Sequence, residues 1–282
     1  MAVERPLPPD ALAPLAPGSL ITLSHGPLSV TLAPQAGGRI AQIVCDGVEH
    51  LVGYSEANAA TIAWGSYPML PWAGRIRKGR FEFQGSTYQL PLNLEGHAIH
   101  GVGFAMPWNV DTRGEHVAEL SLALPEDERW PFGGTARQRI EAGDGWLEMV
   151  LSVTAGLVSM PAVIGWHPWF RKPERLGFSP ASIYPRDEEG LATLPLTEPT
   201  VGPWDDCFIN HFPVTMERAG QKLRLSSDCD HWVVYDQTDF ATCVEPQSGP
   251  PDAFNLAPMV LLPNETLGRR FLIEWQSIDQ GG

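Results

Sequence analysis

The sequence has few cysteines and no long apolar run, and each of these absences excludes a class of protein. Its four cysteines, Cys45, Cys207, Cys229 and Cys243, show no Cys-x-x-Cys spacing. A chain of 282 residues can build a core without disulfides, so we expect free buried thiols and a cytoplasmic location. No apolar run approaches the roughly 20 residues that cross a bilayer. The start of the chain lacks the basic and apolar segments of a secretory signal.

Basic residues are scarce as well. The chain has 19 Lys and Arg against 33 Asp and Glu, a formal net charge of -14. A charge of this sign repels nucleic acid and anionic membranes at long range. We therefore expect no nucleic acid and no membrane as partners, but a small neutral or cationic molecule. For the assembly we expect a monomer or a homodimer.

Long stretches with helical periodicity are absent, whereas 28 glycines and 27 prolines separate many short alternating segments. This pattern is typical of strands joined by turns. Residues 80–90 predict one hairpin, with a type II′ turn at Gly85-Ser86. Residues 135–141 and 146–154 predict a second hairpin. Further strands are expected at 19–23, 28–32, 39–44, 162–171, 223–226, 232–236, 241–245 and 269–276.

These segments predict an all-β fold of large antiparallel sheets packed face to face. The only helix that the pattern favours is one short turn at 125–129. Residues 1–17 contain five prolines, and we expect them to form a flexible lead-in. Residues 18–282 show no linker and no repeat, so we expect one domain.

One aromatic segment carries a titratable group at its centre. Residues Ile164–Phe170 read I-G-W-H-P-W-F, which sets His167 between two tryptophans. Sugars are bound in such surroundings, because their C–H faces stack on rings while a polar group addresses a reacting oxygen. A histidine in an aromatic strand is more often a core residue, so this segment needs support from other residues.

Strand parity gives Glu245 a defined setting. In A-T-C-V-E, Ala241, Cys243 and Glu245 share one face of the expected strand. Small or apolar neighbours would raise the pKa of the carboxyl group by desolvation. The alternative is an acid at a strand end that faces solvent.

Five motifs occur in a characteristic order along the chain. They are P-W-A-G-R-I at Pro71–Ile76, H-G at His100-Gly101, H-P-W-F at His167–Phe170, D-D-C-F at Asp205–Phe208 and V-E-P at Val244–Pro246. In this order and on a β-rich background, they make the chain resemble the aldose 1-epimerase (galactose mutarotase-like) family. The resemblance spans residues 19–277, and it implies a β-supersandwich fold and interconversion of the α and β anomers of a free aldohexose.

The resemblance also implies roles for individual residues. Glu245 matches the general base and His167 the general acid. His100, Arg75 and Asp205 match the residues that bind and orient sugar hydroxyls.

Some positions around these motifs stay open. Trp72 and Gln247 lie beside motif residues and are expected to add contacts to the substrate. Asp205 fits the spacing of its motif better than Asp206, although the two differ by one position only. The family usually has Asn where this chain has Gly74, so the preferred sugar is left open. The tryptophans near the motifs, Trp64, Trp72, Trp166 and Trp169, are expected either in the core or along a sugar cleft.

Anomerisation needs two proton transfers and no cofactor. A base removes the proton of the anomeric hydroxyl while an acid protonates the ring oxygen, and each positioned group typically contributes about 10²–10⁴-fold. We expect no cofactor and no metal. His97 with His100, and Cys207 with His211, lack further ligands at plausible spacing.

Three other functions fit parts of the sequence. Arg75, Arg77, Lys78 and Arg80 could bind phosphate, which would indicate a hexose-6-phosphate 1-epimerase. A solvated loop in which only Arg75 points inward explains this cluster better. A non-catalytic carbohydrate-binding sandwich would need neither an acid nor a base. A glycoside hydrolase would need two carboxylates that flank the scissile bond.

Overall fold

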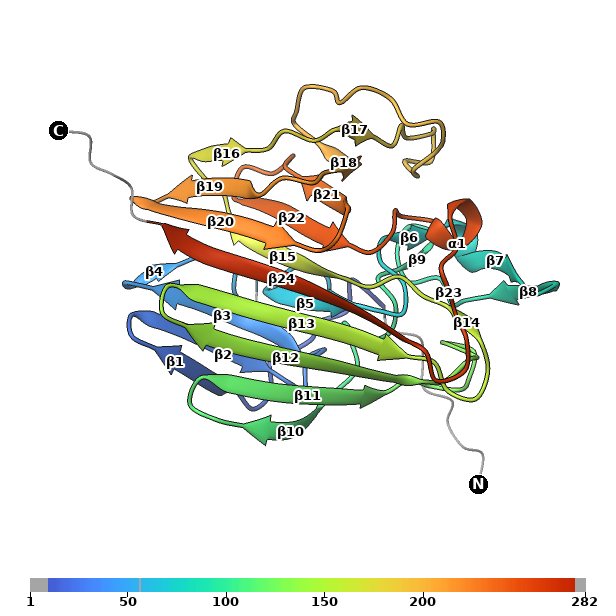
Figure 1. Cartoon of the computed structure of the whole chain (residues 1–282), viewed down its shortest axis with the longest axis horizontal. Helices are drawn as coiled ribbons and strands as arrows, with labels where there is room; N and C mark the ends of the chain where they lie inside the picture. The colour runs from blue at the N-terminus through green and yellow to red at the C-terminus, as the bar shows by residue number, and fades with distance from the viewer. Residues whose placement is uncertain (1–9, 56, 277–282) are drawn as a thin grey trace.

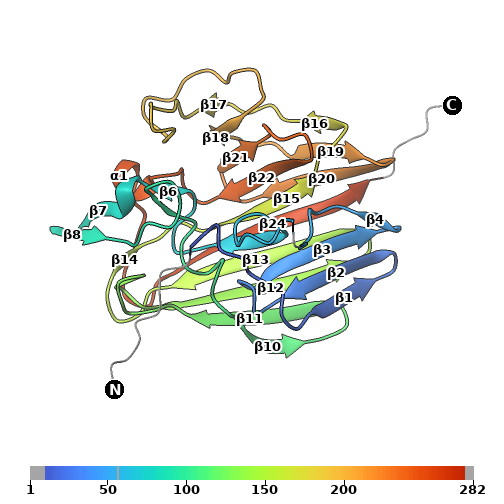
Figure 2. The same cartoon turned by 180° about the vertical axis from the view of Figure 1, so that it is seen from behind.

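The computed structural model describes residues 10–55 and 57–276, and within them almost all regular structure is β-strand. Two large antiparallel sheets form two layers, with the eight-stranded sheet nearer the viewer in Figure 1. Figure 2 shows the ten-stranded sheet from the opposite side. The predicted all-β supersandwich is therefore confirmed.

The ten-stranded sheet contains both motif segments that carry the expected acid and base. Its strand order is β1 (Ile21–His25), β2 (Leu28–Ala33), β3 (Arg39–Cys45), β5 (Ser66–Met69), β15 (Gly165–Arg171), β22 (Ala241–Gln247), β21 (His231–Tyr235), β18 (Asp205–Ile209) and β17 (Ser182–Ile183), with β4 (Val48–Glu49) paired to β3.

The eight-stranded sheet is built largely from the long hairpin that the sequence predicts. Its order is β10 (Asn109–Arg113), β11 (Val117–Ala123), β12 (Thr135–Gly143), β13 (Trp146–Thr154), β24 (Thr266–Gln276), β20 (Gln221–Ser227), β19 (Val214–Arg218) and β16 (Arg175–Gly177). Three two-stranded pairs and two short helical segments complete the described residues: β14 (Met160–Pro161) with β23 (Val260–Leu261), β6 (Arg75–Ile76) with β9 (Ala98–Ile99), β7 (Arg80–Phe83) with β8 (Ser86–Gln89), the 3₁₀ segment Arg77–Gly79 and α1 (Ala253–Leu256).

The core lies between the two sheets and follows from strict alternation along the strands. In β13 every second side chain is buried, from Leu147 to Val153, while the residues between them are partly exposed. From β15, Trp166 packs toward β24, with its ring 5.7 Å from that of Phe271. Because successive side chains in a strand point to opposite faces, the neighbouring His167 points away from the core.

Four local expectations are wrong or incomplete. The β7–β8 turn is Gln84-Gly85, since Phe83 pairs with Ser86, and both turn residues have positive φ, as in a type I′ turn. Residues 125–129 contain no helix and end in a tight turn closed by a bridge between Asp127 and Trp130. The other two expectations concern the set of predicted strands and the flexible lead-in.

Strands β5, β10, β11, β18 and β19 were not predicted from the sequence. They are short or interrupted by charged residues, so their apolar period is weak. Residues 10–17 differ from the expected flexible lead-in. Ala11 is buried and its main chain bonds to Asn93 and Ile62, while Ala13 accepts a bond from Thr61. The rest of that lead-in, residues 1–9, lies outside the described residues.

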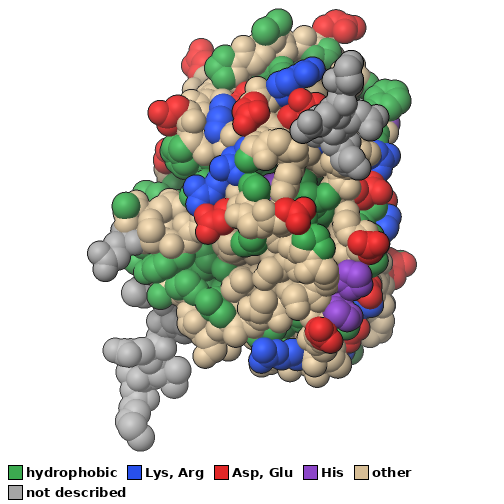
Figure 3. Space-filling model, turned by 90° about the vertical axis from the view of Figure 1, so that its left-hand side faces the viewer, with side chains coloured by type: hydrophobic (Ala, Val, Ile, Leu, Met, Phe, Trp, Pro, Cys, Tyr) green, Lys and Arg blue, Asp and Glu red, His purple; other side chains and the backbone are tan. Residues whose placement is uncertain are grey.

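Charge and cysteine placement agree with the sequence. On the face shown in Figure 3, Lys and Arg side chains lie among Asp and Glu side chains and form no basic patch. All four cysteines lie within the described residues, and each is buried and unpaired. None of the helices in residues 10–55 and 57–276 has the length and apolar character of a membrane span.

Candidate active site

Strand register brings the two expected proton-transfer residues together. Between β15 and β22, Gly165 pairs with Gln247 and Trp169 pairs with Cys243. This register sets His167 opposite Glu245 on the sheet face that points away from the core. A pairing between strands so distant in sequence is a property of the tertiary fold.

The same row continues across the sheet in both directions. On one side His167 pairs with Tyr67 of β5, and on the other Glu245 pairs with Val233 of β21. Asp205 occupies the next row, because it pairs with Tyr235, which pairs with Cys243. The expected acid, base and sugar-binding aspartate therefore lie on one face.

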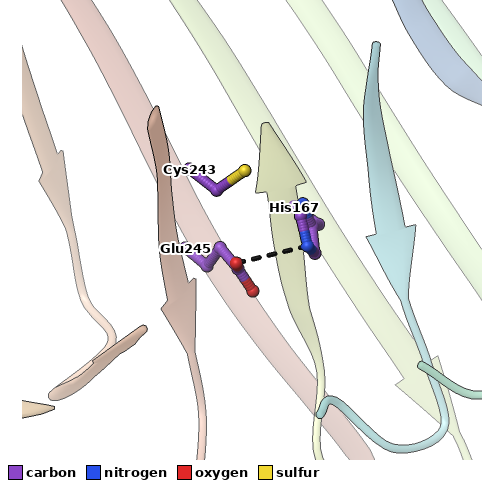
Figure 4. A group of neighbouring side chains, drawn as sticks. All are labelled: His167, Cys243 and Glu245. Atoms are coloured by element: carbon purple, nitrogen blue, oxygen red, sulfur yellow. Dashed lines mark ion pairs between the residues drawn. The ribbon is translucent and has the colours of Figure 1, made fainter. Parts of the chain in front are cut away.

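His167 and Glu245 are in direct contact (Figure 4). The Nε2 atom of His167 lies 3.2 Å from Oε1 of Glu245, and both side chains are buried. The Nε2 atom of Gln247 donates a hydrogen bond of 3.2 Å to the other carboxyl oxygen of Glu245. At these distances a proton can pass between the imidazole and the carboxyl group without movement of the backbone.

Two aromatic rings hold the imidazole of His167 in place. Tyr67 stacks on it at 4.8 Å between centroids and Trp169 at 5.4 Å, with small interplanar angles. The Tyr67 hydroxyl and the Trp169 indole both donate to the carbonyl oxygen of Ile62. The guanidinium of Arg39 lies 5.0 Å from the centre of the Tyr67 ring. The ring of His167 therefore has little freedom to rotate.

Burial shifts the two proton-transfer groups in opposite directions. Desolvation, helped by the charge of Asp205, raises the pKa of Glu245 well above its usual value, as strand parity predicted. Desolvation also lowers the pKa of His167 to about 3, whereas the sequence suggested a value near the ordinary one. Both shifts disfavour charge, so burial favours a protonated carboxyl group on Glu245 beside a neutral imidazole on His167.

His100 completes a compact group of rings. Its imidazole meets that of His167 edge-on at 5.1 Å, and its Nδ1 accepts a bond from the main-chain nitrogen of Gly74. Burial lowers the pKa of His100 well below its usual value, and the neighbouring His167 adds to this shift. His100 is therefore a neutral group that offers its other ring nitrogen for hydrogen bonding.

Both arginines at the site are already paired with acids. The guanidinium of Arg75 donates to Glu95 at 2.8 Å. Arg186 lies 3.0 Å from Asp205. Burial raises the pKa of Asp205, although the charge of Arg186 opposes this shift.

These side chains line a cavity of about 470 Å³. A volume of this size lies within the roughly 300–1,000 Å³ typical of small-molecule sites. All six expected site residues other than Trp72 line this cavity, and Asp206 lies beside them. The six are Arg75, His100, His167, Asp205, Glu245 and Gln247. Because Asp205 and Asp206 both line the cavity, the cavity lining alone does not separate them.

Trp72 does not belong to this lining. It is buried, its indole nitrogen donates to the carbonyl of Ala98, and its ring packs 5.9 Å from that of Trp130. The expectation that Trp72 contacts the substrate is therefore not supported. Of the tryptophans near the motifs, only Trp169 lines the cavity, because Trp64 and Trp166 point into the interior.

The basic cluster around Arg75 is neutralised locally. Arg77 pairs with Asp187 and Glu189, and Lys78 also pairs with Glu189. Within the described residues, only Arg75 of this cluster lines the cavity, as the solvated-loop interpretation predicted.

Sequence reasoning missed several residues of the site. Tyr67 and Tyr235 follow from strand register, which required the pairing of β5 and β21 with their neighbours. Tyr184 and Arg186 lie before and after Pro185, in a segment with no recognisable motif. Glu95 carried no signal because it lies in a turn outside the family motifs.

Comparison with known proteins places this site in a family. The family model for aldose 1-epimerase matches residues 19–274. Two uncharacterized proteins of Escherichia coli strain K12 are similar. YihR is 26% identical over 275 residues, with 87% of this chain and 89% of that protein covered. YphB is 32% identical over 156 residues, with 54% and 52% covered, so the match spans about half the length of that relative.

A solved structure from Escherichia coli K12 has the same fold as this chain. It belongs to a candidate aldose 1-epimerase of Escherichia coli K12 and superimposes with a TM-score of 0.82 at 21% identity. The match covers 92% of this chain and 99% of that one. With the family model matching nearly all the described residues, the chain belongs to the aldose 1-epimerase family.

Proposed function

We propose that this protein is an aldose 1-epimerase that interconverts the α and β anomers of an unphosphorylated aldohexose. The observation that carries the proposal is the contact between His167 and Glu245 inside a cavity large enough for a monosaccharide. Family membership supports an epimerase in general, and the charges in the cavity support a free sugar as substrate.

The reaction uses one proton that the pair holds. With the proton on His167, Glu245 takes the proton of the anomeric hydroxyl while His167 protonates the ring oxygen. The C–O bond of the ring breaks and the open aldehyde forms. Rotation about the C1–C2 bond presents the other face of the carbonyl, and the reverse transfers close the ring as the other anomer.

Burial favours the form of the pair that exists after ring opening. In that form the carboxyl group is protonated and the imidazole is neutral, in line with the raised pKa of Glu245 and the lowered pKa of His167. The charged form of the pair is therefore less favourable unless other groups donate hydrogen bonds to it. Sugar hydroxyls that donate to the carboxylate would favour it, since hydrogen bonds to the charged form lower the pKa.

The remaining polar groups are suited to bind sugar hydroxyls. Arg75 is a fixed planar donor, Asp205 is an acceptor, and His100 offers a neutral ring nitrogen. Gln247 presents a buried carbonyl oxygen that has no hydrogen-bond partner among the described residues. A substrate hydroxyl that donates to this oxygen would remove the unfavourable burial of an unpaired acceptor.

The charge balance of the cavity argues against a phosphorylated substrate. Arg75 and Arg186 are each paired with an acid, and Asp206 adds negative charge to the lining. A phosphate would have to break one of these pairs and approach the other carboxylates. This favours a neutral sugar over a hexose 6-phosphate.

A binding module without turnover is the main alternative. A pure binder gains nothing from an acid and a carboxyl group held in contact, since burying ionisable groups costs free energy. The stacked position of His167 between Tyr67 and Trp169 favours catalysis for the same reason.

The test follows freshly dissolved α-galactose and α-glucose by anomer-resolved NMR, with and without the protein. Replacing Glu245 by Gln keeps the shape and should lower the enzymatic rate by about 10²–10⁴-fold. The matched control is Glu82→Gln on the exposed face of β7, which should keep the full rate. An unchanged rate in Glu245→Gln would refute the assignment of the base, and faster conversion of glucose 6-phosphate would refute the preference for free sugars.

A further inference from the structure

A thiol lies beside the proton-transfer pair and has no part in the proposed reaction. Cys243 precedes Glu245 by two positions on β22, so the two side chains share a face. A ligand atom from each of His167, Cys243 and Glu245 lies within 4.8 Å of the other two, and all three residues are buried. Figure 4 shows the sulfur and the carboxyl group on β22 both directed toward the imidazole on β15.

The three donors match the preferences of zinc. Zn²⁺ binds thiolate, imidazole and carboxylate at about 2.0–2.3 Å, which separates two ligands of a tetrahedral site by roughly 3.4–3.6 Å. The 3.2 Å between His167 and Glu245 is close to this spacing. The other two separations between ligand atoms are at most 4.8 Å. Side-chain rotations that move these atoms by about 1 Å would bring them to the spacing of a tetrahedral zinc site. Magnesium and calcium are less suited, because they prefer oxygen ligands.

The charges also balance. A zinc ion with a thiolate, a carboxylate and a neutral imidazole has no net charge, which suits a buried position better than any isolated charge. Binding displaces the proton of the Cys243 thiol and the proton held by the His167–Glu245 pair. The imidazole is not committed elsewhere, since Nδ1 of His167 has no hydrogen-bond partner among the described residues. His167 and Glu245 line the cavity, from which a water would be the fourth ligand, whereas the buried Cys243 lies outside the lining.

We propose that His167, Cys243 and Glu245 form a zinc site at which the ion inhibits the epimerase. The ion would occupy both proton-transfer groups at once, so the sugar could be neither deprotonated nor protonated there. The inhibitory half rests on the proposed function, whereas binding of the ion does not. A sugar bound in the cavity should compete with the ion for the same groups.

The test uses the full-length protein and separates binding from activity. Cobalt(II) serves as a spectroscopic probe, because a thiolate ligand gives an intense near-ultraviolet charge-transfer band. We expect this band in the unaltered protein, its removal by zinc, and a rise in melting temperature with added zinc. Zinc should also slow anomer exchange, with galactose in excess weakening the inhibition.

The variant Cys243→Ala distinguishes this site from other metal-binding groups. It should lose the cobalt band and bind zinc at least tenfold more weakly, while keeping its rate without metal within about threefold. Cys229→Ala is the matched control and should behave as the unaltered protein, because Cys229 is also buried but lies between β20 and β21 and outside the cluster. Glu245→Gln gives a second measurement, since it should weaken zinc binding while keeping the thiolate.

Each outcome decides between the two proposals. The absence of a thiolate band, or equal zinc sensitivity in Cys243→Ala and the unaltered protein, would overturn the zinc site. A cobalt band that depends on Cys243 in a protein without epimerase activity would support the zinc site and overturn the proposed function. If Cys243→Ala does not fold, the band in the unaltered protein and the higher cobalt concentration that Glu245→Gln needs to produce it still test the site.

Discussion

The protonation state of His167 offers the sharpest test of the electrostatics of the active site. Burial between Tyr67 and Trp169 lowers its pKa from 6.5 to about 3. At pH 5.5 an imidazole with the ordinary pKa would be about 90% protonated. With a pKa of about 3, less than about 1% would be protonated. The shift corresponds to roughly 5 kcal/mol between the two protonation states.

The assay is a titration of the ring nitrogens by long-range proton–nitrogen NMR, with His167 assigned by comparison with His167→Gln. We expect the neutral imidazole throughout pH 5–8, because Glu245 keeps the shared proton in the empty cavity. A midpoint near 6.5 would show that burial does not control this group. An imidazolium that persists across the whole range would show that the pair rests in the charged form.

The pH dependence of kcat/KM should reflect the lowered pKa of His167. Since the pKa of His167 is about 3, titration of this imidazole should change kcat/KM less than about twofold between pH 5.5 and pH 7. The histidine limb that an exposed acid would produce should be missing. A fall in kcat/KM centred at pH 6.5, with the fold intact by circular dichroism, would contradict this reasoning.

Three further predictions concern the frame around the site. Gly74→Ala should lower the free energy of unfolding by at least about 1 kcal/mol in urea titration, because φ is +68° there and a Cβ atom would lie 2.8 Å from that of Pro251; equal stability would show that Pro251 moves freely. Arg39→Lys should cost several kcal/mol (about 1–3 per lost bond), since its guanidinium donates to four buried carbonyl groups, and a urea midpoint unchanged from that of the unaltered protein would refute this. Acid should destabilise the fold between pH 6.5 and pH 4, because burial lowers the pKa values of His50 and His231 to about 4. These two residues, like the buried His100 and His167, take up a proton only on unfolding, which is worth up to about 1.4 kcal/mol per pH unit for each. The protons that folded Glu245 and Asp205 retain oppose this but are fewer, and a urea midpoint that is constant over this range would contradict the prediction.

The Gly74 prediction bears on substrate preference. The family usually has Asn at this position, and the sequence alone left the consequence open. In the structure a Cβ atom at position 74 would lie 2.8 Å from that of Pro251, so this contact opposes any side chain there, including that of Asn. The main-chain nitrogen of Gly74 donates a hydrogen bond to Nδ1 of His100.

Local pattern accounts for much of what the sequence predicted. The alternation in residues 146–154 reappears as one buried and one partly exposed face of β13. Parity in β22 placed Glu245 with Cys243 and offered two settings for its carboxyl group, of which the structure shows the buried one with a raised pKa. Such features depend on residues two to ten positions apart, so sequence reasoning reaches them.

The sequence by itself determined the strand-rich character, the family motifs and the face on which Glu245 lies. Only the tertiary structure decided that β15 and β22 are neighbours, that Trp72 turns into the core, and that Arg186 and Glu95 neutralise the charges at the cavity. The physical reason is that pairing between distant strands and the loops that cover them set burial, and burial controls both the pKa of His167 and the room left for a sugar.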